Sequence, residues 1–388
     1  MNPPSVGLFV DSFTPIMDGV TTTVRNCAYW LDRMMGPTCV VTPRVPGHAD
    51  NESFNVIRFL SLPTLVRPPY RMGLPALDFR LRAILKSHDF SIVHAHSPFG
   101  AGHAALAVGR AKGVPVIATF HSKFRENLRQ AIPIQRIVQD QVKRIVDFLY
   151  SVDQVWIPQE SVAETLRDYG YHGPYEVVEN GTDFTPSADT ARYRARGGGY
   201  LGVPEEARVG LFVGQLVLEK NLEFLFASLP RVIAQVPHFR MVLVGEGYAK
   251  RRLQALSREL GMQDRVILRD AILDRELLKA VYARGDLFLF PSLYDNAPLV
   301  IREAAALRTP AVLVRGATAA EVIRDNHNGF LSDACPDAFA GRVVEVMRDN
   351  ELRKRVGCRA QGTLCRSWES IATEIRDRYR TILSRWRR

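Results

Sequence analysis

Two carboxylates in the C-terminal half of the chain, Asp295 and Glu303, stand on either side of the expected start of a helix. Asp295 lies in a polar loop that follows an apolar run, and Glu303 stands eight residues later, inside a helix expected from about Ala297 to Leu307. The start of such a helix offers free N–H groups and a positive dipole end, which suit a diphosphate. Glu303 can accept hydrogen bonds from two hydroxyls of a ribose, and Asp295 from hydroxyls of a sugar. The structural alternative is that Asp295 caps the helix and Glu303 pairs with an arginine.

The elements that position these residues follow one pattern in both halves of the chain. Short apolar runs rich in β-branched residues alternate with longer segments of helical period, which is typical of parallel sheets with crossover helices. In the first half we expect strands at Val6–Val10, Cys39–Thr42, Val56–Phe59, Ile92–His94, Val116–Thr119 and Gln154–Ile157, and helices at about Val20–Met34, Leu77–Lys86 and Ala101–Lys112.

The second half repeats the pattern after Arg192–Pro204, a segment with three consecutive glycines that is interpreted as a linker. Expected strands are Val209–Val213, Met241–Val244, Arg265–Leu268, Leu287–Phe290 and Ala311–Val314, with helices at about Leu222–Gln235, Lys250–Glu259 and Asp274–Ala283. Two facing doubly wound domains explain this order most simply. Ligands of such sheets bind beyond the carboxyl ends of the strands, so the loops after strands are where the chemistry is expected.

The composition is that of an ordinary globular protein, with 46% apolar and 24% charged residues in 388. The chain has no apolar run of about 18 residues, which a membrane-spanning helix needs. Five cysteines without a CxxC pair indicate a reducing cytosol rather than disulfides or a zinc ribbon. The nearest metal-ligand pair, His94 and His96, is interpreted as a strand end and a loop residue, so no metal site is predicted.

The net charge of +10 is concentrated in basic segments. From Glu351 onward eleven Lys and Arg face four acidic residues, and a second basic run extends from Arg58 to Lys86. Such segments suit anionic lipid, phosphorylated substrates or nucleic acid. Because no nucleic-acid-binding motif accompanies them, we expect lipid or phosphate, and a merely solvated basic surface is the alternative.

Several motifs together resemble those of the family-4 retaining glycosyltransferases. The pair Asp295-x7-Glu303, followed by Ala304-Ala305-Ala306, is similar to the family's EX7E signature. The other similarities occur in the family's order: the loop Asp11–Val20 with Gly19, His121 after a strand, Asn180-Gly181-Thr182-Asp183, the run Gly214–Asn221 with Lys220, and the turn Gly245-Glu246-Gly247.

The resemblance implies the GT-B fold: two facing doubly wound Rossmann-like domains with a C-terminal helix that crosses back to the first domain. The expected acceptor-binding domain is 1–190, the donor-binding domain is 191–366, and the crossover helix is 367–388. The tail from about Ser367 is expected to be this helix, with an apolar stripe for the contact. The resemblance also implies that the reaction takes place in the cleft between the domains.

The resemblance assigns catalytic roles to four residues. Lys220 would neutralise the donor diphosphate as it leaves, Asp295 and Glu303 would hold the donor, and His121 would hydrogen-bond the reacting sugar or the departing phosphate. Gly19 would let the backbone approach the donor. Other donor contacts are expected at Gln215, Gly245, Asn296, Ala297, Leu299 and Val300. The implied donor is a UDP- or GDP-sugar, and no cofactor or metal is required.

Three residues depart from the family pattern. Gln215 stands where the family usually has an arginine that binds the diphosphate, so Lys220 would have to neutralise more of the diphosphate charge. Asp295 replaces a glutamate and has a shorter reach. Pro298 replaces a glycine and lacks an N–H, so phosphate contacts must come from Leu299 and Val300. These departures motivate one alternative, a catalytically degenerate protein that binds a nucleotide sugar. A sugar-nucleotide epimerase of similar fold is disfavoured, because the motifs follow the transferase order.

The acceptor is expected to be a membrane lipid. The segments Ile57–Pro63, Val93–Gly100 and Ala118–Phe124 resemble the branch of the family that glycosylates diacylglycerol, phosphatidylinositol and sulfolipid. A basic amphipathic helix from about Ile134 to Tyr150 could lie on anionic lipid or pack on its own domain, and the basic tail is a second candidate for membrane contact. A capsular or other glycan acceptor is the alternative. The predicted location is cytoplasmic, with a peripheral contact at the inner face of the cell membrane.

Overall fold

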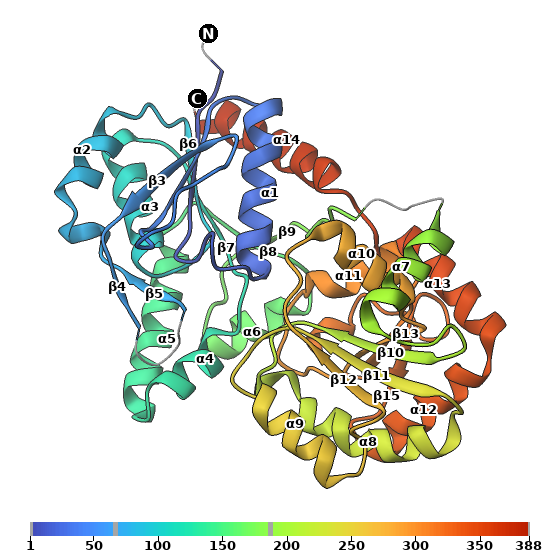
Figure 1. Ribbon diagram of the computed structural model, residues 1–388. Helices are drawn as coiled ribbons and strands as arrows, with labels where there is room; N and C mark the ends of the chain where they lie inside the picture. Colours follow the sequence, from blue (N-terminus) through green and yellow to red (C-terminus); the bar gives the residue numbers. More distant parts are fainter. Residues whose placement is uncertain (1–2, 65–68, 185–188, 387–388) are drawn as a thin grey trace. The chain divides into compact units, whose positions relative to one another are not determined.

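The computed structural model describes residues 3–64, 69–184 and 189–386 (Figure 1). The chain forms two compact units. The first comprises Met1–Gly181 together with Trp368–Arg388, and the second comprises Thr182–Ser367. The first unit is therefore discontinuous in sequence, since it contains both ends of the chain.

The N-terminal unit is built on a seven-stranded parallel sheet in the order β3-β2-β1-β6-β7-β8-β9. Its central strands are buried along their whole length, as expected where helices cover both faces of a parallel sheet. The strands are β1 (Val6–Phe9), β2 (Thr38–Pro43), β3 (Asn55–Phe59), β6 (Ile92–Ala95), β7 (Val116–Thr119), β8 (Gln154–Ile157) and β9 (Glu176–Val177). The helices are α1 (Gly19–Met34), α2 (Phe79–Ser87), α3 (Gly100–Lys112), α4 (Phe124–Ala131), α5 (Gln135–Tyr150), α6 (Val162–Tyr169) and α14 (Trp368–Trp386).

A small antiparallel hairpin stands apart from this sheet. It pairs β4 (Ser61–Pro63) with β5 (Arg71–Gly73) and leads through the short 3-10 helix η1 (Pro75–Leu77) into α2. The hairpin was not predicted, because each strand has only three residues.

The C-terminal helix α14 belongs to the N-terminal unit and packs against α1. Trp368, Ile371, Ile375, Tyr379 and Ile382 form its buried stripe. The expected helix is therefore present, and its last two expected residues, 387 and 388, lie outside the described residues.

The C-terminal unit contains a six-stranded parallel sheet in the order β12-β11-β10-β13-β14-β15. Its strands are β10 (Arg208–Val213), β11 (Phe239–Val244), β12 (Val266–Arg269), β13 (Leu287–Phe290), β14 (Ala311–Val314) and β15 (Phe330–Ser332). Its helices are α7 (Thr190–Leu201), α8 (Leu222–Gln235), α9 (Lys250–Glu259), α10 (Arg275–Arg284), α11 (Leu299–Ala306), α12 (Pro336–Arg348) and α13 (Asn350–Leu364), with short 3-10 helices η2 (Leu218–Lys220) and η3 (Thr318–Ala320).

The interpretation of Arg192–Pro204 as a linker is wrong, because most of this segment forms α7. One of the three glycines, Gly197, serves packing rather than flexibility. A Cβ atom at Gly197 would lie 2.0 Å from the carbonyl oxygen of Ala280 in α10, and one at Gly198 would lie 3.4 Å from Nε of Arg284. Glycine is required at position 197 because the backbones of α7 and α10 approach each other so closely.

Helix α5 packs on its own unit, which was the alternative to lying on lipid. Val142, Ile145, Val146 and Leu149 on its apolar face belong to the core of the N-terminal unit, and Val138 is also buried. Ile134 and Ile137, near the start of the helix, are exposed, as is Tyr150 at its end. The apolar face is thus largely unavailable to a membrane.

Candidate functional site

Lys220 and Asp295 form an ion pair in the C-terminal unit. Lys220 ends η2, which follows β10, and Asp295 lies in the loop after β13. Because β10 and β13 are parallel neighbours, the loops at their carboxyl ends lie side by side. The Lys220 ammonium contacts Oδ1 of Asp295, and each side chain is only 15% exposed. The other oxygen, Oδ2, is buried and has no hydrogen-bond partner within the described part of the chain.

Asp295 does not cap the helix that follows it, so the structural alternative for this residue is wrong. Helix α11 begins at Leu299, and its N-cap residue is Pro298, which makes no side-chain capping bond. Leu299 and Val300 are therefore the first two residues of the helix, whose N–H groups have no partner within a helix of this geometry. Asn296 is buried in the loop before them, and Ala297 is half-buried.

Glu303 is buried in α11, and both of its oxygens accept hydrogen bonds. Arg275 donates from Nη2 to Oε1 at 2.7 Å, and the Tyr282 hydroxyl donates to Oε2 at 2.8 Å. Arg275 also donates from Nε to Asp183 at 2.9 Å. The arginine partner considered as an alternative from the sequence is thus present. Glu303 can still accept further hydrogen bonds, because the two oxygens of a carboxylate have about four lone-pair positions.

Gln215 and Gly245 lie in neighbouring loops at the carboxyl ends of β10 and β11. A Cβ atom at Gly245 would lie 1.9 Å from the carbonyl oxygen of Gly214, and one at Gly247 would lie 2.2 Å from that of Leu216. The two loops therefore cross in direct backbone contact. The glycines of this turn are required by the fold, whether or not a nucleotide also touches them.

Three histidines stack in the N-terminal unit. His94 and His96 have ring centroids 4.2 Å apart, and His96 and His121 have centroids 5.2 Å apart. His94 Nδ1 lies 2.6 Å from the Tyr379 hydroxyl of α14, and its Nε2 lies 2.7 Å from the Thr119 hydroxyl. His96 Nδ1 lies 2.9 Å from His121 Nε2. His121 is thus held by a second histidine.

Burial keeps these histidines neutral. It lowers the pKa of His121 to about 4 and that of His94 to about 3, and it lowers the pKa of His96 well below its usual range. The buried Nε2 of His96 has no hydrogen-bond partner among the described residues. Since an orphaned buried N–H is rarer than an unsatisfied acceptor, we assign the His96 proton to Nδ1, from which it is donated to His121. His121 then carries its own proton on Nδ1.

Gly19 is the first residue of α1. The preceding Asp18 caps the helix by accepting a hydrogen bond from Thr21 N at 2.8 Å. A Cβ atom at Gly19 would meet no atom within 4 Å. The packing of the protein therefore does not require glycine at this position, so a requirement for glycine would have to come from a ligand.

Comparison with known families identifies the chain. The model for glycosyl transferases group 1 matches residues 200–363, and the model for glycosyltransferase family 4 matches residues 17–185. The chain belongs to glycosyltransferase family 4. It is 24% identical over 350 residues to an alpha-monoglucosyldiacylglycerol synthase of Streptococcus pneumoniae, covering 88% of this chain and 78% of the relative. It is also 24% identical to a GDP-mannose-dependent alpha-mannosyltransferase of Corynebacterium glutamicum, covering 99% and 90%.

The fold of this glycosyltransferase is similar to that of solved structures. Anabaena HepE, solved in complex with UDP and glucose, superposes with a TM-score of 0.76 at 17% identity, covering 98% of this chain and 100% of HepE. The likeness confirms the GT-B fold predicted from the sequence. None of the helices in the described residues combines the length and apolar character that a membrane span requires. Nor do those residues contain three His, Cys, Asp or Glu side chains grouped to hold a metal ion.

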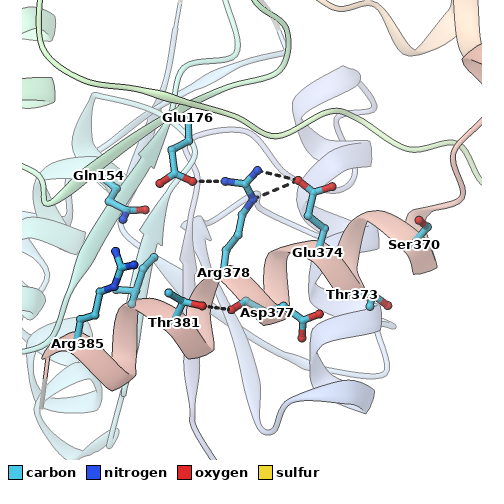
Figure 2. A pocket seen from close by; sticks show the side chains of 10 residues that line it. Gln154, Glu176, Ser370, Thr373, Glu374, Asp377, Arg378, Thr381 and Arg385 are labelled. Atoms are coloured by element: carbon cyan, nitrogen blue, oxygen red, sulfur yellow. Dashed lines mark hydrogen bonds and ion pairs between the residues drawn. The ribbon is translucent and has the colours of Figure 1, made fainter.

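A groove of about 610 Å³ lies along α14 of the glycosyltransferase, and none of the sequence-predicted site residues lines it (Figure 2). Arg378 points across it and is paired with Glu176 and Glu374. Asp377 and Arg385 also line it. Two carboxylates already neutralise Arg378, and none of the residues predicted to bind the donor lines this groove, so we do not assign donor binding to it.

Sequence reasoning missed His96, Arg275 and Tyr282 as partners of the site. For His96 a signal was present, because residues two apart on a strand point to the same face, and His94-x-His96 therefore places both rings together. Arg275 and Tyr282 gave no comparable signal. They lie at the start and in the middle of α10, and only the fold brings them to Glu303.

Proposed function

We propose that this glycosyltransferase moves a hexose from a UDP- or GDP-sugar to a hydroxyl of a membrane lipid of the diacylglycerol or phosphatidylinositol type, with retention of anomeric configuration and without a metal ion. The relatives support the coarser part of the proposal, since one is a glycolipid synthase and another uses GDP-mannose. The proposed location is cytoplasmic, at the inner face of the cell membrane.

The observation that carries the donor assignment is the arrangement of Lys220 and Asp295. Lys220 is paired with Asp295 in the loop that leads into α11, and the other carboxylate oxygen of Asp295, Oδ2, is buried without a partner among the described residues. Leaving such an acceptor unsatisfied costs about 1–3 kcal/mol, so a sugar hydroxyl that donates to it would bind favourably. When a diphosphate binds Lys220, Asp295 loses its cation and becomes a stronger acceptor for the sugar.

Glu303 is proposed to hold the ribose. Each of its oxygens already accepts one hydrogen bond and retains a second lone pair. Arg275 and Tyr282 fix the carboxylate in one orientation, so Glu303 loses little conformational entropy when the ribose hydroxyls bind. Leu299 and Val300 offer N–H groups to the diphosphate, and Gln215 and Gly245 line the neighbouring loops.

The proposed reaction needs no enzymatic nucleophile. The bond between the sugar C1 and the leaving phosphate oxygen breaks, and a bond from C1 to the acceptor oxygen forms on the same face. The proton of the acceptor hydroxyl passes to the departing diphosphate. Lys220 stabilises the charge that develops on that diphosphate. His121 is proposed to donate from Nδ1 to the sugar or phosphate, and Gly19 to leave room for the donor.

The acceptor is assigned to the N-terminal unit. A pocket of about 200 Å³ follows the carboxyl end of β6 and is lined by Phe99, His103 and Arg144. Arg144 has no ion-pair partner among the described residues, so this pocket supports an acceptor with a polar or anionic head group. Assembly of a capsular or other glycan is the alternative, and an acceptor panel of lipids and oligosaccharides separates the two.

The test is transfer from a panel of UDP- and GDP-sugars, first ranked by thermal shift. Transfer should fall by about a hundredfold or more in Lys220→Ala and Glu303→Ala. Lys354→Ala and Glu345→Ala are matched controls, because these exposed residues form surface ion pairs on α13 and α12 of the same unit. Full activity in both site variants would disprove the donor assignment. Tight donor binding without transfer to any acceptor would favour the degenerate binding protein.

A further inference from the structure

The hairpin β4–β5 exposes an apolar face. Leu62 and Met72 are direct cross-strand partners, so their side chains project from the same face of the hairpin, and they are 48% and 51% exposed. Leu60, two residues before Leu62, has the same orientation and is 40% exposed. An isolated two-stranded hairpin gains little stability by itself in water, and an apolar face without cover is unusual for a monomer.

The apolar surface continues from the hairpin to the start of α2. Asp78 joins the two, because its Oδ2 accepts from Leu60 N at 2.8 Å and its Oδ1 accepts from Leu81 N at 2.9 Å. On either side of Asp78, Leu77 is 63% exposed and Phe79 is 76% exposed. We call Leu60, Leu62, Met72, Leu77 and Phe79, with the cations described next, the hairpin surface. In Figure 1 the hairpin and α2 lie along the same edge of the N-terminal unit.

The charges on this surface are cationic. Phe79, Arg82 and Lys86 share the outward face of α2, while Leu81 and Leu85 point into the core. The Arg82 guanidinium lies 5.4 Å from the centre of the Phe79 ring. Arg80, Arg82 and Lys86 form no ion pair with any described residue. Asp78, the one acidic residue between Leu60 and Lys86, is buried and bonded to backbone, so it does not offset these charges at the surface.

We propose that the hairpin surface docks on an anionic lipid bilayer. The apolar side chains would enter the boundary between head groups and acyl chains, and Arg80, Arg82 and Lys86 would contact the anionic head groups. The proposal moves membrane contact away from α5, whose apolar face is buried. The role of this docking rests on the proposed lipid acceptor, because docking would bring the N-terminal unit to the membrane that contains the acceptor.

The charge distribution disfavours a second copy of the chain as the occupant. A symmetric dimer places the same patch on both subunits in contact. Here it would bring Arg80, Arg82 and Lys86 against the same residues of the partner, without an exposed acid between Leu60 and Lys86 to compensate. An anionic lipid surface supplies the missing negative charge.

The experiment is flotation of the full chain with vesicles of phosphatidylcholine, with or without phosphatidylglycerol, and without donor or acceptor. Binding should require phosphatidylglycerol and weaken with salt. Leu62→Ser/Met72→Ser and Arg82→Gln/Lys86→Gln should each weaken binding by about tenfold or more. The controls are Leu260→Ser at the end of α9 and Arg355→Gln on α13, two exposed residues of the C-terminal unit, and they should bind as the wild type does.

Three outcomes would overturn the proposal: wild-type chain that ignores anionic vesicles, two double variants that bind as the wild type does, or a dimer that forms without vesicles and is lost in Leu62→Ser/Met72→Ser. Because all four substituted side chains are exposed, the variants should retain the wild-type thermal shift with UDP or GDP. A loss of sugar transfer with vesicle binding intact would contradict the proposed function and leave the docking surface standing.

Discussion

His96 and His121 are joined through Nδ1 of the first and Nε2 of the second, at 2.9 Å. His121 is the histidine that the family resemblance places at the active site, and the hydrogen bond from His96 orients its ring. Because the Nε2 atom of His96 is buried without a partner among the described residues, donation from His96 to His121 is the assignment that leaves no buried N–H unsatisfied.

This assignment predicts different outcomes for two substitutions of His96. His96→Asn retains an N–H near the position of Nδ1 and should keep transfer within about threefold of wild type. His96→Leu removes the donor and should lower kcat by roughly tenfold to a hundredfold, with little change in the KM for the donor sugar. Steady-state kinetics on both variants provide the measurement. Equal losses would mean that His96 only fills space.

The ion pair of Lys220 and Asp295 predicts opposite effects on binding and on transfer. In Asp295→Ala the ammonium is released from its partner, so UDP or GDP without a sugar should bind about threefold more tightly. Transfer should nevertheless collapse, since the sugar hydroxyls lose their acceptor. Isothermal titration and a transfer assay on the same samples test this. Asp295→Glu, which restores the residue usual in the family, should remain active. If Asp295→Ala weakens nucleotide binding as much as Lys220→Ala does, the ion pair is not a competitor of the diphosphate.

Two tyrosine–glutamate hydrogen bonds in the C-terminal unit allow a matched comparison. Tyr282 donates to the buried Glu303 at 2.8 Å, and Tyr193 donates to the exposed Glu276 at 2.6 Å. Tyr282→Phe leaves a buried carboxylate oxygen unsatisfied and should lower the free energy of unfolding by about 1–3 kcal/mol. Tyr193→Phe should change it by less than about 0.5 kcal/mol, because water replaces the hydroxyl. Urea unfolding of both variants measures these changes. Similar losses in the free energy of unfolding would contradict the expected effect of burial.

The histidine stack predicts acid sensitivity of the N-terminal unit. In the unfolded chain histidines titrate near pH 6.5, whereas burial lowers the pKa of His121 to about 4 and that of His94 to about 3. Between these values the unfolded state binds more protons, so stability is complete above about pH 6.5 and falls as the pH decreases towards 4. The loss is about 1.4 kcal/mol per pH unit for each histidine.

Trp156 provides the probe for this acid sensitivity, since its ring contacts His94 at a centroid distance of 5.0 Å. Its fluorescence in urea titrations at several pH values should follow the unfolding of this unit. His96→Asn, which lacks one titrating ring, should give a shallower slope than wild type. A slope unaffected by that substitution would mean that His96 is protonated in the folded state as readily as in the unfolded state.

The glycines of α7 predict a pair of opposite stability changes. A Cβ atom at Gly197 would collide with Ala280 of α10, whereas one at Gly199 would meet no atom within 4 Å. Gly197→Ala should therefore destabilise the C-terminal unit by more than about 2 kcal/mol. Gly199→Ala should stabilise it by about 0.5–1 kcal/mol, because alanine loses less backbone freedom in a helix. Thermal unfolding of the two variants measures both signs, and a destabilised Gly199→Ala would contradict the packing argument.

The regular elements of both sheets were accessible from the sequence because their apolar patterns are long and uninterrupted. The strands at Val116–Thr119, Gln154–Ile157, Leu287–Phe290 and Ala311–Val314 have the predicted bounds. Helix α7 was not predicted, because consecutive glycines normally weaken a helix, and the compensating contact with α10 is invisible in a linear pattern. The hairpin β4–β5 was not predicted, because strands of three residues are too short to show an alternation of apolar and polar residues.

The candidate site divides in the same way. Lys220, Asp295, Glu303 and His121 lie in loops or helices directly after strands, where sequence order and the family motifs indicate chemistry. Their partners were not predictable, because Arg275, Tyr282 and His96 reach them through tertiary packing. The sequence thus predicts which side chains act more readily than it predicts which side chains hold them.

The hydrogen bond between Tyr379 and His94 means that the N-terminal unit cannot be completed early in translation. Tyr379 lies in α14, which follows the C-terminal unit in the sequence, while the strand that carries His94 precedes that unit. Until the whole C-terminal unit and α14 have been translated, His94 in the N-terminal sheet lacks its hydrogen-bond partner Tyr379. A polypeptide cut short after the C-terminal unit would therefore contain Lys220, Asp295 and Glu303 yet lack a finished N-terminal unit.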